Sequence, residues 1–348
     1  MSAGDHFCLD TRFGAVFYWH VNHFTKAHPT PPWVTMQVQT TASRRPLDVL
    51  TVSDMCVDLV LTGDVRPRFH QIEQIIDNYD LELGGSANIF ACQLAKLGAQ
   101  VGVVGRVGQD ALGEFVLGKL QEAGVVVTEV RRHPSLKTGL GVALADPQDR
   151  AILTYLGTID AVQPHDLTGD LAATAAHWHI ASFFLLRSLR ECWREWIRRC
   201  KDVGLTVSLD VNWDPENLWQ GVVDLLPMVD VFFPNENEAM AITGETDLIK
   251  AVERLASLGP VVVTKCGKEG AIARKSSRHW EIRPSDFDAE PVSVVDAIGA
   301  GDNFDAGFIR AWMLHRSMEE CLVLGHRCAV SSLACAGGIR GQLQECVA

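Results

Sequence analysis

From residue 47 onward, short apolar segments alternate with amphipathic ones, and this alternation constrains the fold more than any other feature of the chain. The apolar segments are nearly continuous, as in QVGVVG, VDVFFPN and PVVVTKCG. Such runs are typical of strands that are buried on both faces of a parallel sheet. We therefore expect a three-layer α/β/α sandwich with a mainly parallel central sheet. Ligand sites in such sheets lie beyond the carboxyl ends of the strands.

Helical periodicity marks the segments between the strands. Helices are expected over residues 86–97, 110–123, 188–203, 236–243, 247–258, 300–315 and 318–336. Two regions, about 58–83 and 125–157, break the alternation. The second contains two strand-like segments around ADPQDR, a sequence suited to a turn. We expect these regions to form a small β lid, which would exclude water from a site beneath it.

The first 45 residues differ from the rest, being rich in histidine and aromatic residues without a sustained period. We expect residues 1–45 to be an appendage outside the fold, which would occupy residues 46–345. Met36 stands just before the regular pattern and would be a plausible start. We therefore hypothesise that residues 1–35 are absent from the native protein.

Composition excludes several classes of partner. The 348-residue chain has 31 basic and 43 acidic residues, a net charge of −12, which disfavours binding to nucleic acid. No apolar stretch approaches the length of a membrane span, and the first residues lack the order of a secretion signal. The ten cysteines include no C-x-x-C pair, which is typical of reduced thiols in a cytoplasmic protein.

Two sets of side chains could in principle hold a metal ion. Cys321, Cys328 and Cys335 are spaced by seven residues, near one face of a predicted helix. His177 and His179 alternate along a predicted strand and share a face. For both sets we favour packing, because free cysteine behaves as a small apolar residue and no carboxylates accompany the histidines.

The segment DAIGAGDNFDAGF places small residues directly before an acid at a helix start. Gly299, Ala300 and Gly301 would leave backbone N–H groups bare at the positive end of the helix dipole, which favours an anion. Asp302 follows at once. It could be a simple helix cap, but an acid beside a bound anion is better explained as an acceptor for a proton.

A second glycine-rich segment, ELGGSANIF, stands at another predicted helix start. Gly84 and Gly85 permit a close backbone approach, and Asn88 offers a donor and an acceptor suited to a hydroxyl. The alternative is a tight strand–helix turn with an asparagine cap. The G-x-G-x-x-G pattern of dinucleotide sites is absent. Asp58 follows the first predicted strand, where it could join the same site or act as a cap.

Two further segments carry candidate binding residues. In VFFPNENEAM, Asn235 and Glu238 would share one face at a helix start, where Glu238 could hold hydrated Mg²⁺ or close a capping box. In VVVTKCGKEG, Thr264 ends a buried strand and Gly267 shapes a turn that could hold a nucleotide or begin a hairpin. The chain contains no P-loop sequence and no protein-kinase motif set.

Together these segments resemble the ribokinase/PfkB family of carbohydrate and nucleoside kinases over residues 47–340. GGSANIFACQLAKLG and DAIGAGDNFDAGF resemble the family's two signatures, in the family's order. The resemblance implies a ribokinase-like fold and the transfer of the γ-phosphate of ATP to a hydroxymethyl group. It also implies a role for each candidate residue. Asp302 would be the general base, and the backbone N–H groups of Gly299, Ala300 and Gly301 would donate to the transferring phosphate. Asp58, Gly84, Gly85 and Asn88 would bind substrate hydroxyls, Asn235, Thr264 and Gly267 would contact the nucleotide, and Glu238 would hold Mg²⁺ through water.

The implied cofactors are ATP and Mg²⁺, with a monovalent cation as a further candidate, and the implied partners are a sugar and a second copy joined through the lid. Three positions depart from the family pattern. Ala297 replaces a common threonine, Cys328 replaces an asparagine near adenine, and Asp214 replaces a frequent basic residue. A sugar or sugar acid is the favoured acceptor. The alternatives are a nucleoside kinase and a sugar-binding regulator without catalytic activity.

Overall fold

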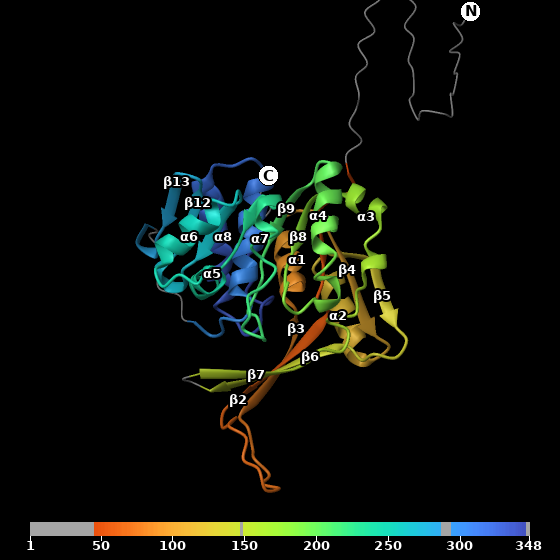
Figure 1. The fold of residues 1–348 in the computed structure, drawn as a ribbon. Coiled ribbons are helices and arrows are strands. Elements are labelled where there is room, and N and C mark those ends of the chain that lie inside the picture. The colour runs from red at the N-terminus through yellow and green to blue at the C-terminus, as the bar shows by residue number, and fades with distance from the viewer. Residues whose placement is uncertain (1–44, 147–148, 287–293, 346–348) are drawn as a thin grey trace, which may run out of the picture. The chain divides into compact units, whose positions relative to one another are not determined.

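A computed structural model describes residues 45–146, 149–286 and 294–345. Its large sheet contains nine strands in the order β13-β12-β11-β10-β9-β8-β1-β4-β5 (Figure 1). The strands are β1 Leu47–Val52, β4 Val101–Gly108, β5 Val126–His133, β8 Ala175–Ile180, β9 Thr206–Leu209, β10 Val231–Phe232, β11 Val261–Lys265, β12 Ala271–Lys275 and β13 Arg278–Ile282. All neighbours from β11 to β5 are parallel, whereas β12 and β13 are antiparallel, which confirms a mainly parallel sheet.

Helices cover both faces of this sheet because successive strand residues point to opposite sides. In β11, Val261 and Val263 enter one core and Val262 enters the other. The first core is shared with α1 Ser86–Lys96, α2 Ala111–Glu122, α7 Ala300–Met313 and α8 Met318–Ser332. The second is shared with α3 Gly169–Thr174, α4 Trp193–Asp202, α5 Glu236–Thr243 and α6 Leu248–Ala256. The expected three-layer sandwich is therefore confirmed.

The predicted helices are present with some differences at their ends. Helix α5 has the predicted bounds, but α4 begins at Trp193 because a 3₁₀ turn, Arg187–Leu189, occupies the expected first turn. Four other 3₁₀ turns are described: Pro164–Asp166, Leu226–Met228, Gly267–Glu269 and Pro284–Asp286. The predicted appendage, residues 1–45, lies outside the described residues except for Arg45.

A second sheet forms the lid, in the order β3-β2-β6-β7. Its strands are β2 Cys56–Thr62, β3 Asn78–Gly84, β6 Gly139–Asp146 and β7 Asp149–Tyr155. The two strands expected around ADPQDR are the antiparallel pair β6 and β7. Residues 126–133, which we expected in the lid, instead form β5 at the edge of the large sheet, paired with β4. The lid projects from one end of the sandwich (Figure 1).

His177 and His179 are packed inside the sheet, as favoured above. The two rings of His177 and His179 are linked through the hydroxyl of Ser208, at 2.7 and 2.8 Å, and His177 also bonds Thr206 at 2.7 Å. His179 stacks on Phe90 of α1 with 3.9 Å between ring centroids. Burial lowers the pKa of both histidines to about 3, so both are neutral.

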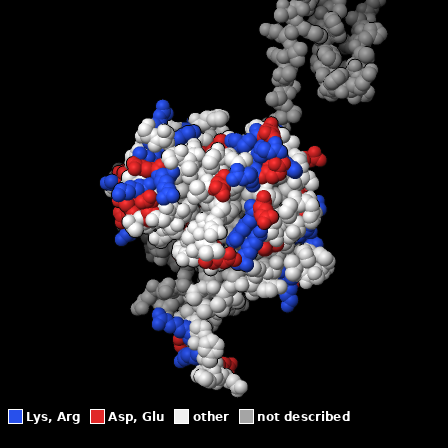
Figure 2. Space-filling view, in the orientation of Figure 1, with Lys and Arg blue, Asp and Glu red and all other residues white. Residues whose placement is uncertain are grey.

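No arrangement of three potential metal ligands occurs among the described residues. Cys321 and Cys328 are buried core side chains, and every described cysteine is a free thiol. Within the same residues no helix is long and apolar enough to cross a bilayer. On the face shown in Figure 2, basic and acidic side chains are interspersed rather than gathered into a field of one sign.

Candidate active site

The site is built where the N-termini of α1 and α7 meet beyond the carboxyl ends of the central strands. Asp302 lies in the first turn of α7, and hydrogen bonding from Ser86, the first residue of α1, reaches its carboxylate. Burial, followed by the negative charge of Asp210, raises the pKa of Asp302 to about 8. Lys265 and Ser86 oppose this shift. Asp302 is therefore a carboxyl group of increased proton affinity in the first turn of a helix.

The start of α7 is open toward a ligand. Gly299 is the N-cap residue with φ 73°, and a β-carbon there would lie 2.8 Å from Cδ1 of Ile89. Glycine is therefore required by both backbone and packing. The N–H of Ala300 donates to the carbonyl oxygen of Ala297 at 3.4 Å, and no described side chain caps the N–H groups of Gly301 or Asp302. These donors and the helix dipole together favour an anion.

The start of α1 is closed by an acid from the chain itself. The carboxylate of Asp54, just beyond β1, accepts N–H groups from Ser86 at 3.0 Å and Ala87 at 3.2 Å, and the hydroxyl of Ser182 at 2.6 Å. Gly85 has φ 89°, and a β-carbon there would lie 2.5 Å from the carbonyl oxygen of Asp54. The paired glycines thus bring the chain against Asp54.

Two of the predicted hydroxyl-binding residues have different surroundings. Asp58 lies in β2 of the lid between two glycines, and β-carbons on Gly84 and Gly141 would lie within 2.7 Å of its carboxyl group. Asn88 is fully buried, donates to the carbonyl of Gly84 at 2.8 Å and accepts from Ser53. Asn88 therefore orders the strand–helix turn, and its contact with a substrate stays a prediction.

A buried ion cluster was missed at the sequence level. Nζ of Lys265 lies 2.6 Å from Asp210 Oδ2 and 3.1 Å from Asp305 Oδ2. Burial alone would lower the pKa of Lys265, but these carboxylates raise it above its ordinary value. A β-carbon on Gly301 would lie 3.5 Å from the same nitrogen. Lys265 therefore places a positive charge beneath the open start of α7.

Asn235 and Glu238 form the capping box considered from the sequence. Oδ1 of Asn235 accepts the N–H of Glu238, and Oε2 of Glu238 accepts the N–H of Asn235, both at 2.9 Å. Burial and then the charge of Asp210 raise the pKa of Glu238 to about 7. Its carboxylate therefore belongs electrostatically to the Lys265 cluster, while its contact with magnesium stays a prediction.

The remaining candidates lie in distinct environments. Thr264 is fully buried within β11, whereas Gly267 is exposed with φ 53° at the turn after that strand. Cys328 is buried against Gly307 between α8 and α7. Asp214 accepts backbone N–H groups from its own loop, including that of Trp219 at 2.7 Å.

Three site residues that we did not predict from the sequence share the same position relative to the sheet. Asp54, Asp210 and Lys265 all stand at or just beyond the carboxyl ends of parallel strands, namely β1, β9 and β11. Asn212, in the left-handed region with φ 55°, follows β9 and donates to the hydroxyl of Ser86. A systematic search for polar residues at strand ends would have found this set.

Comparison with known proteins agrees with this architecture. Residues 47–345 match the pfkB family of carbohydrate kinases. The 2-dehydro-3-deoxygluconokinase of Bacillus subtilis is 27% identical over 313 residues, covering 82% of this chain and 93% of that protein. The ATP-dependent 6-phosphofructokinase of Thermoanaerobacterium thermosaccharolyticum is 28% identical over 301 residues, covering 84% and 89%.

Solved structures share the fold. The Arabidopsis thaliana ribokinase complexed with ribose and ATP has a TM-score of 0.73 at 24% identity, covering 85% of this chain and 95% of that one. An adenosine kinase from Sinorhizobium meliloti has a TM-score of 0.74 at 23% identity, covering 84% and 95%. The resemblance seen in the two glycine-rich segments is thus confirmed. The chain belongs to the PfkB family of carbohydrate kinases and is a phosphotransferase that acts on a sugar hydroxyl.

Proposed function

We propose that this kinase transfers the γ-phosphate of ATP to a hydroxymethyl group of a sugar or sugar acid, with Asp302 as general base. The observation that carries the proposal is the start of α7, where a carboxyl group of raised pKa lies beside the N–H groups of Gly301 and Asp302, which no described side chain caps. Phosphoryl transfer requires charge stabilisation at the phosphate and a positioned hydroxyl. The N–H groups would stabilise the charge on the phosphate, and Asp302 would position the hydroxyl.

In the proposed step the acceptor hydroxyl oxygen forms a bond to the γ-phosphorus, and the bond to the β–γ bridging oxygen breaks to release ADP. Asp302 accepts the hydroxyl proton as the new bond forms. The N–H groups of Gly301 and Ala300 donate to the transferring phosphate. Lys265, held by Asp210 and Asp305, adds positive charge beneath the same turn.

The residues present suit magnesium. Mg²⁺ keeps most of its water and prefers one or two carboxylates, and Glu238 and Asp210 provide these near the anion site. When bound, the ion would neutralise phosphate charge. Its contact with Glu238 would run through water, because one oxygen of that carboxylate is already held by the capping box. Asn235 and Gly267 would contact the nucleotide, and Thr264 would support them from within β11.

One observation favours nucleosides as a second acceptor class. Trp213 is 56% exposed, packs edge-on against Trp219 at 5.0 Å, and follows Asn212, which bonds Ser86 in the site. An exposed indole can stack on a base. This possibility makes nucleosides a necessary part of any acceptor screen.

Acceptor-dependent release of ADP tests the proposal. The full chain would be incubated with ATP and Mg²⁺ and a panel of neutral sugars, sugar acids and nucleosides. We expect turnover with a sugar or sugar acid, and a phosphorus NMR signal split by the two protons of a terminal CH₂. Release of ADP that no acceptor stimulates would favour the regulator, and a preference for nucleosides would favour the second class.

We also propose that the lid joins two copies of the chain. Ile152, Leu153 and Tyr155 on β7 are 52%, 61% and 49% exposed, which is unusual for side chains of this size on a strand. Light scattering of the wild-type protein and of Leu153→Asp would test this, since a lid dimer should be lost in the variant. A cytoplasmic location stays a prediction.

A further inference from the structure

Residues 337–340, C-terminal to α8, pack between the lid and the start of α7. Gly337 lies against lid strand β3, because a β-carbon on it would lie 2.6 Å from Cγ of Glu82. Gly338 lies against the N-cap of α7, because a β-carbon on Gly299 would lie 3.0 Å from Cα of Gly338. Both residues of the segment are buried. The segment therefore contacts the acceptor side and the phosphate side of the proposed site at once.

Hydrogen bonds fix this segment to the start of α7. The side-chain amide of Asn303 in α7 donates to the carbonyl oxygen of Gly338 at 2.9 Å and to that of the N-cap residue at 2.8 Å. Asp296, just before the helix, accepts the N–H of Gly337 at 3.0 Å. The position of residues 337–340 is therefore tied to the helix start that would bind phosphate.

Arg340 joins the same segment to the lid. Its Nη1 lies 3.3 Å from Oδ1 of Asp80, and its guanidinium also pairs with Glu82; both acids belong to β3. The Glu82 side chain is 5% exposed, and among the described residues Arg340 is the one cation in ion-pair contact with it. Burial raises the pKa of Glu82, and the charge of Arg340 is the strongest influence against this rise. Arg340 therefore supplies the main counter-charge of a nearly buried carboxylate.

The strand that Arg340 contacts also carries backbone predicted to bind the acceptor. Glu82 lies directly opposite Asp58 of β2, so the two side chains share one face of the lid sheet. Two residues further along the chain, Gly84 ends β3, and Gly85 leads into α1. A displacement of β3 would therefore move the groups predicted to bind the acceptor hydroxyls.

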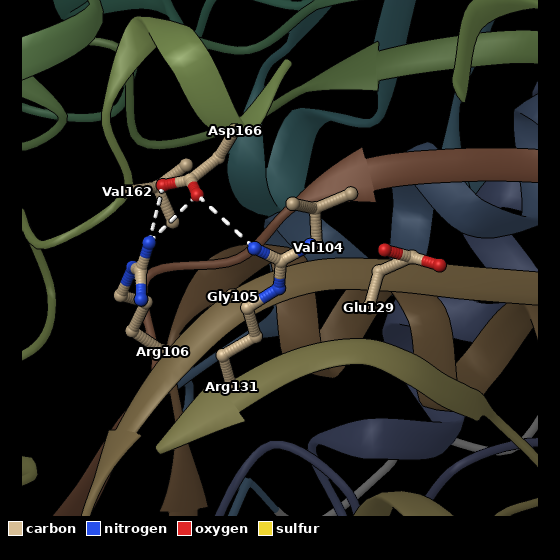
Figure 3. A pocket seen from close by; sticks show the side chains of 7 residues that line it. All are labelled: Val104, Gly105, Arg106, Glu129, Arg131, Val162 and Asp166. Atoms are coloured by element: carbon tan, nitrogen blue, oxygen red, sulfur yellow. Dashed lines mark hydrogen bonds and ion pairs between the residues drawn. The ribbon is translucent and has the colours of Figure 1, made fainter. Parts of the chain in front are cut away.

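A second ion pair of similar burial lies elsewhere in the sandwich and provides a comparison (Figure 3). The guanidinium of Arg106 in β4 donates to both oxygens of Asp166, at 2.6 and 2.8 Å, and Arg131 approaches the same carboxyl group at 3.9 Å. The Asp166 side chain is 8% exposed. The pocket beside this pair has a volume of about 10 Å³, which holds one water molecule at most. This pair joins the large sheet to a 3₁₀ turn, neither of which belongs to the lid.

We propose that Arg340 is a positioning residue for phosphoryl transfer. Through Glu82 it holds β3, and with it the backbone of Gly84 and Gly85, at a fixed position relative to the start of α7. This inference rests on the proposed function, because it takes the α7 start as the phosphate site and the paired glycines as part of the acceptor site. Without Arg340, the Glu82 carboxylate would lose its main counter-charge in a nearly buried position, and β3 would shift to expose it.

Arg340→Gln tests the inference. We expect kcat/KM for the best acceptor to fall about tenfold to a hundredfold, because a shift of about 1 Å misplaces the acceptor hydroxyl. The affinity for ATP alone, measured by calorimetry, should change less than about twofold, because the start of α7 keeps its own hydrogen bonds. Arg340→Lys should recover part of the loss, since lysine keeps the charge but lacks the planar fork that reaches two carboxylates. An acceptor kcat/KM that matches the wild type, or an equal loss of ATP affinity, would overturn the inference.

A double variant shows whether Arg340 acts through Glu82. If it does, Arg340→Gln combined with Glu82→Gln should have the kcat/KM of the worse single variant, because the same interaction is lost in all three. Losses that multiply would contradict the inference.

The stability control is Arg106→Gln, which breaks the comparison pair. Its melting temperature should fall, and its acceptor kcat/KM should stay within about twofold of the wild-type value. A loss of kcat/KM as large as that of Arg340→Gln would mean that lowered stability, rather than the position of β3, explains both effects.

Hydrogen exchange of the unliganded protein separates this inference from the proposed function. In Arg340→Gln the amides of β3 should exchange faster than in the wild type, whereas those of α4 should not change. If no acceptor stimulates ADP release by the wild type, the proposed function fails, and exchange in β3 still decides whether Arg340 holds this strand. Unchanged exchange in β3 would rule out the positioning role.

Discussion

Helices α1 and α7 begin with similar sequences, but the backbone N–H groups at their N-termini have different partners. Each is preceded by glycine with a positive φ, 89° at Gly85 and 73° at Gly299, and each start lies beside the other. At α1, Asp54 accepts the first N–H groups, so the protein supplies its own anion. At α7, no described side chain does so. The N-terminal N–H groups of α1 are thus satisfied by a carboxylate of the protein itself, whereas the start of α7 can bind an anionic ligand.

A glycine-rich helix start can therefore bind an anion only where no side chain from elsewhere in the fold already accepts its N–H groups. The dipole and bare N–H groups are common to both helices. A carboxylate placed from a distant strand cancels them in one case, and in the other Lys265 reinforces them from β11.

The largest effect is expected from Asp302→Asn, which keeps the shape of the α7 start but removes its proton acceptor. General base catalysis contributes about 10²–10⁴ in rate, and we expect kcat to fall by that much. ATP affinity measured above pH 8, where Asp302 is ionised, should be kept or increased, because a negative charge near the phosphates is lost. The measurements are kcat on the best acceptor and ATP binding by calorimetry. A variant that melts normally and retains more than about a tenth of wild-type turnover would show that Asp302 is not the base.

A matched pair of glycine substitutions separates stability from activity. In Gly301→Ala the three nearest atoms to the new methyl group would all belong to Lys265, at 3.5 Å or more, so the fold should be kept. The methyl group should hinder the approach of the phosphate and lower kcat/KM by up to about a hundredfold. Gly85→Ala should instead destabilise the fold by about 1–3 kcal/mol, through its positive φ and its contact with Asp54. Urea unfolding and steady-state kinetics of both variants measure this. Equal loss of stability in both would contradict the comparison.

At the start of α5 the capping box satisfies the first N–H groups, and its residue Glu238 is also the predicted magnesium-binding residue. Glu238→Gln preserves the capping box, which glutamine also forms, but replaces the charge near the phosphates. We expect the Mg²⁺ concentration for half-maximal turnover to rise by about tenfold, with little change in melting temperature. Initial rates across a magnesium titration measure this. If the variant matches the wild type at limiting Mg²⁺, Glu238 acts only as a cap.

The smallest effect concerns the sheet beneath both helices, where His179 stacks on Phe90 of α1. Burial lowers the pKa of His177 and His179 from 6.5 to about 3, so their stabilising contribution is present above pH 6.5 and is lost as the pH falls. Asp230 and Lys201 act on His177, and Asp210 and Lys265 act on His179. Each histidine should cost about 1.4 kcal/mol per pH unit below that point.

Unfolding free energies of the wild type and His177→Gln, measured between pH 7 and about 5, test this. The variant should lose less stability on acidification, by about 1.4 kcal/mol per pH unit. A comparison of variants is needed because Asp302 and Glu238, whose pKa values are raised, gain stability over the same range. His70→Gln, at an exposed loop position, is the control and should follow the wild type. Parallel curves for His177→Gln would contradict the prediction.

The layers of the fold and the local structure at the helix starts could be predicted from patterns along the chain. Alternating apolar strands and amphipathic helices predict a covered parallel sheet, and the capping box of Asn235 and Glu238 depends on residues three apart. Gly85 and Gly299 are likewise local, because positive φ favours glycine. Such features depend on neighbours along the chain, so they can be predicted from a pattern. The edge position of β5 was not, because its pairing with β4 depends on sheet order.

Contacts between distant parts of the chain determine which helix start lacks a side-chain cap and which charged side chains form ion pairs. Asp54 reaches α1 from 32 residues away, and Lys265 reaches Asp210 and Asp305 across 55 and 40 residues. No local pattern contains these contacts, because they arise where parallel strands end at a common edge of the sheet.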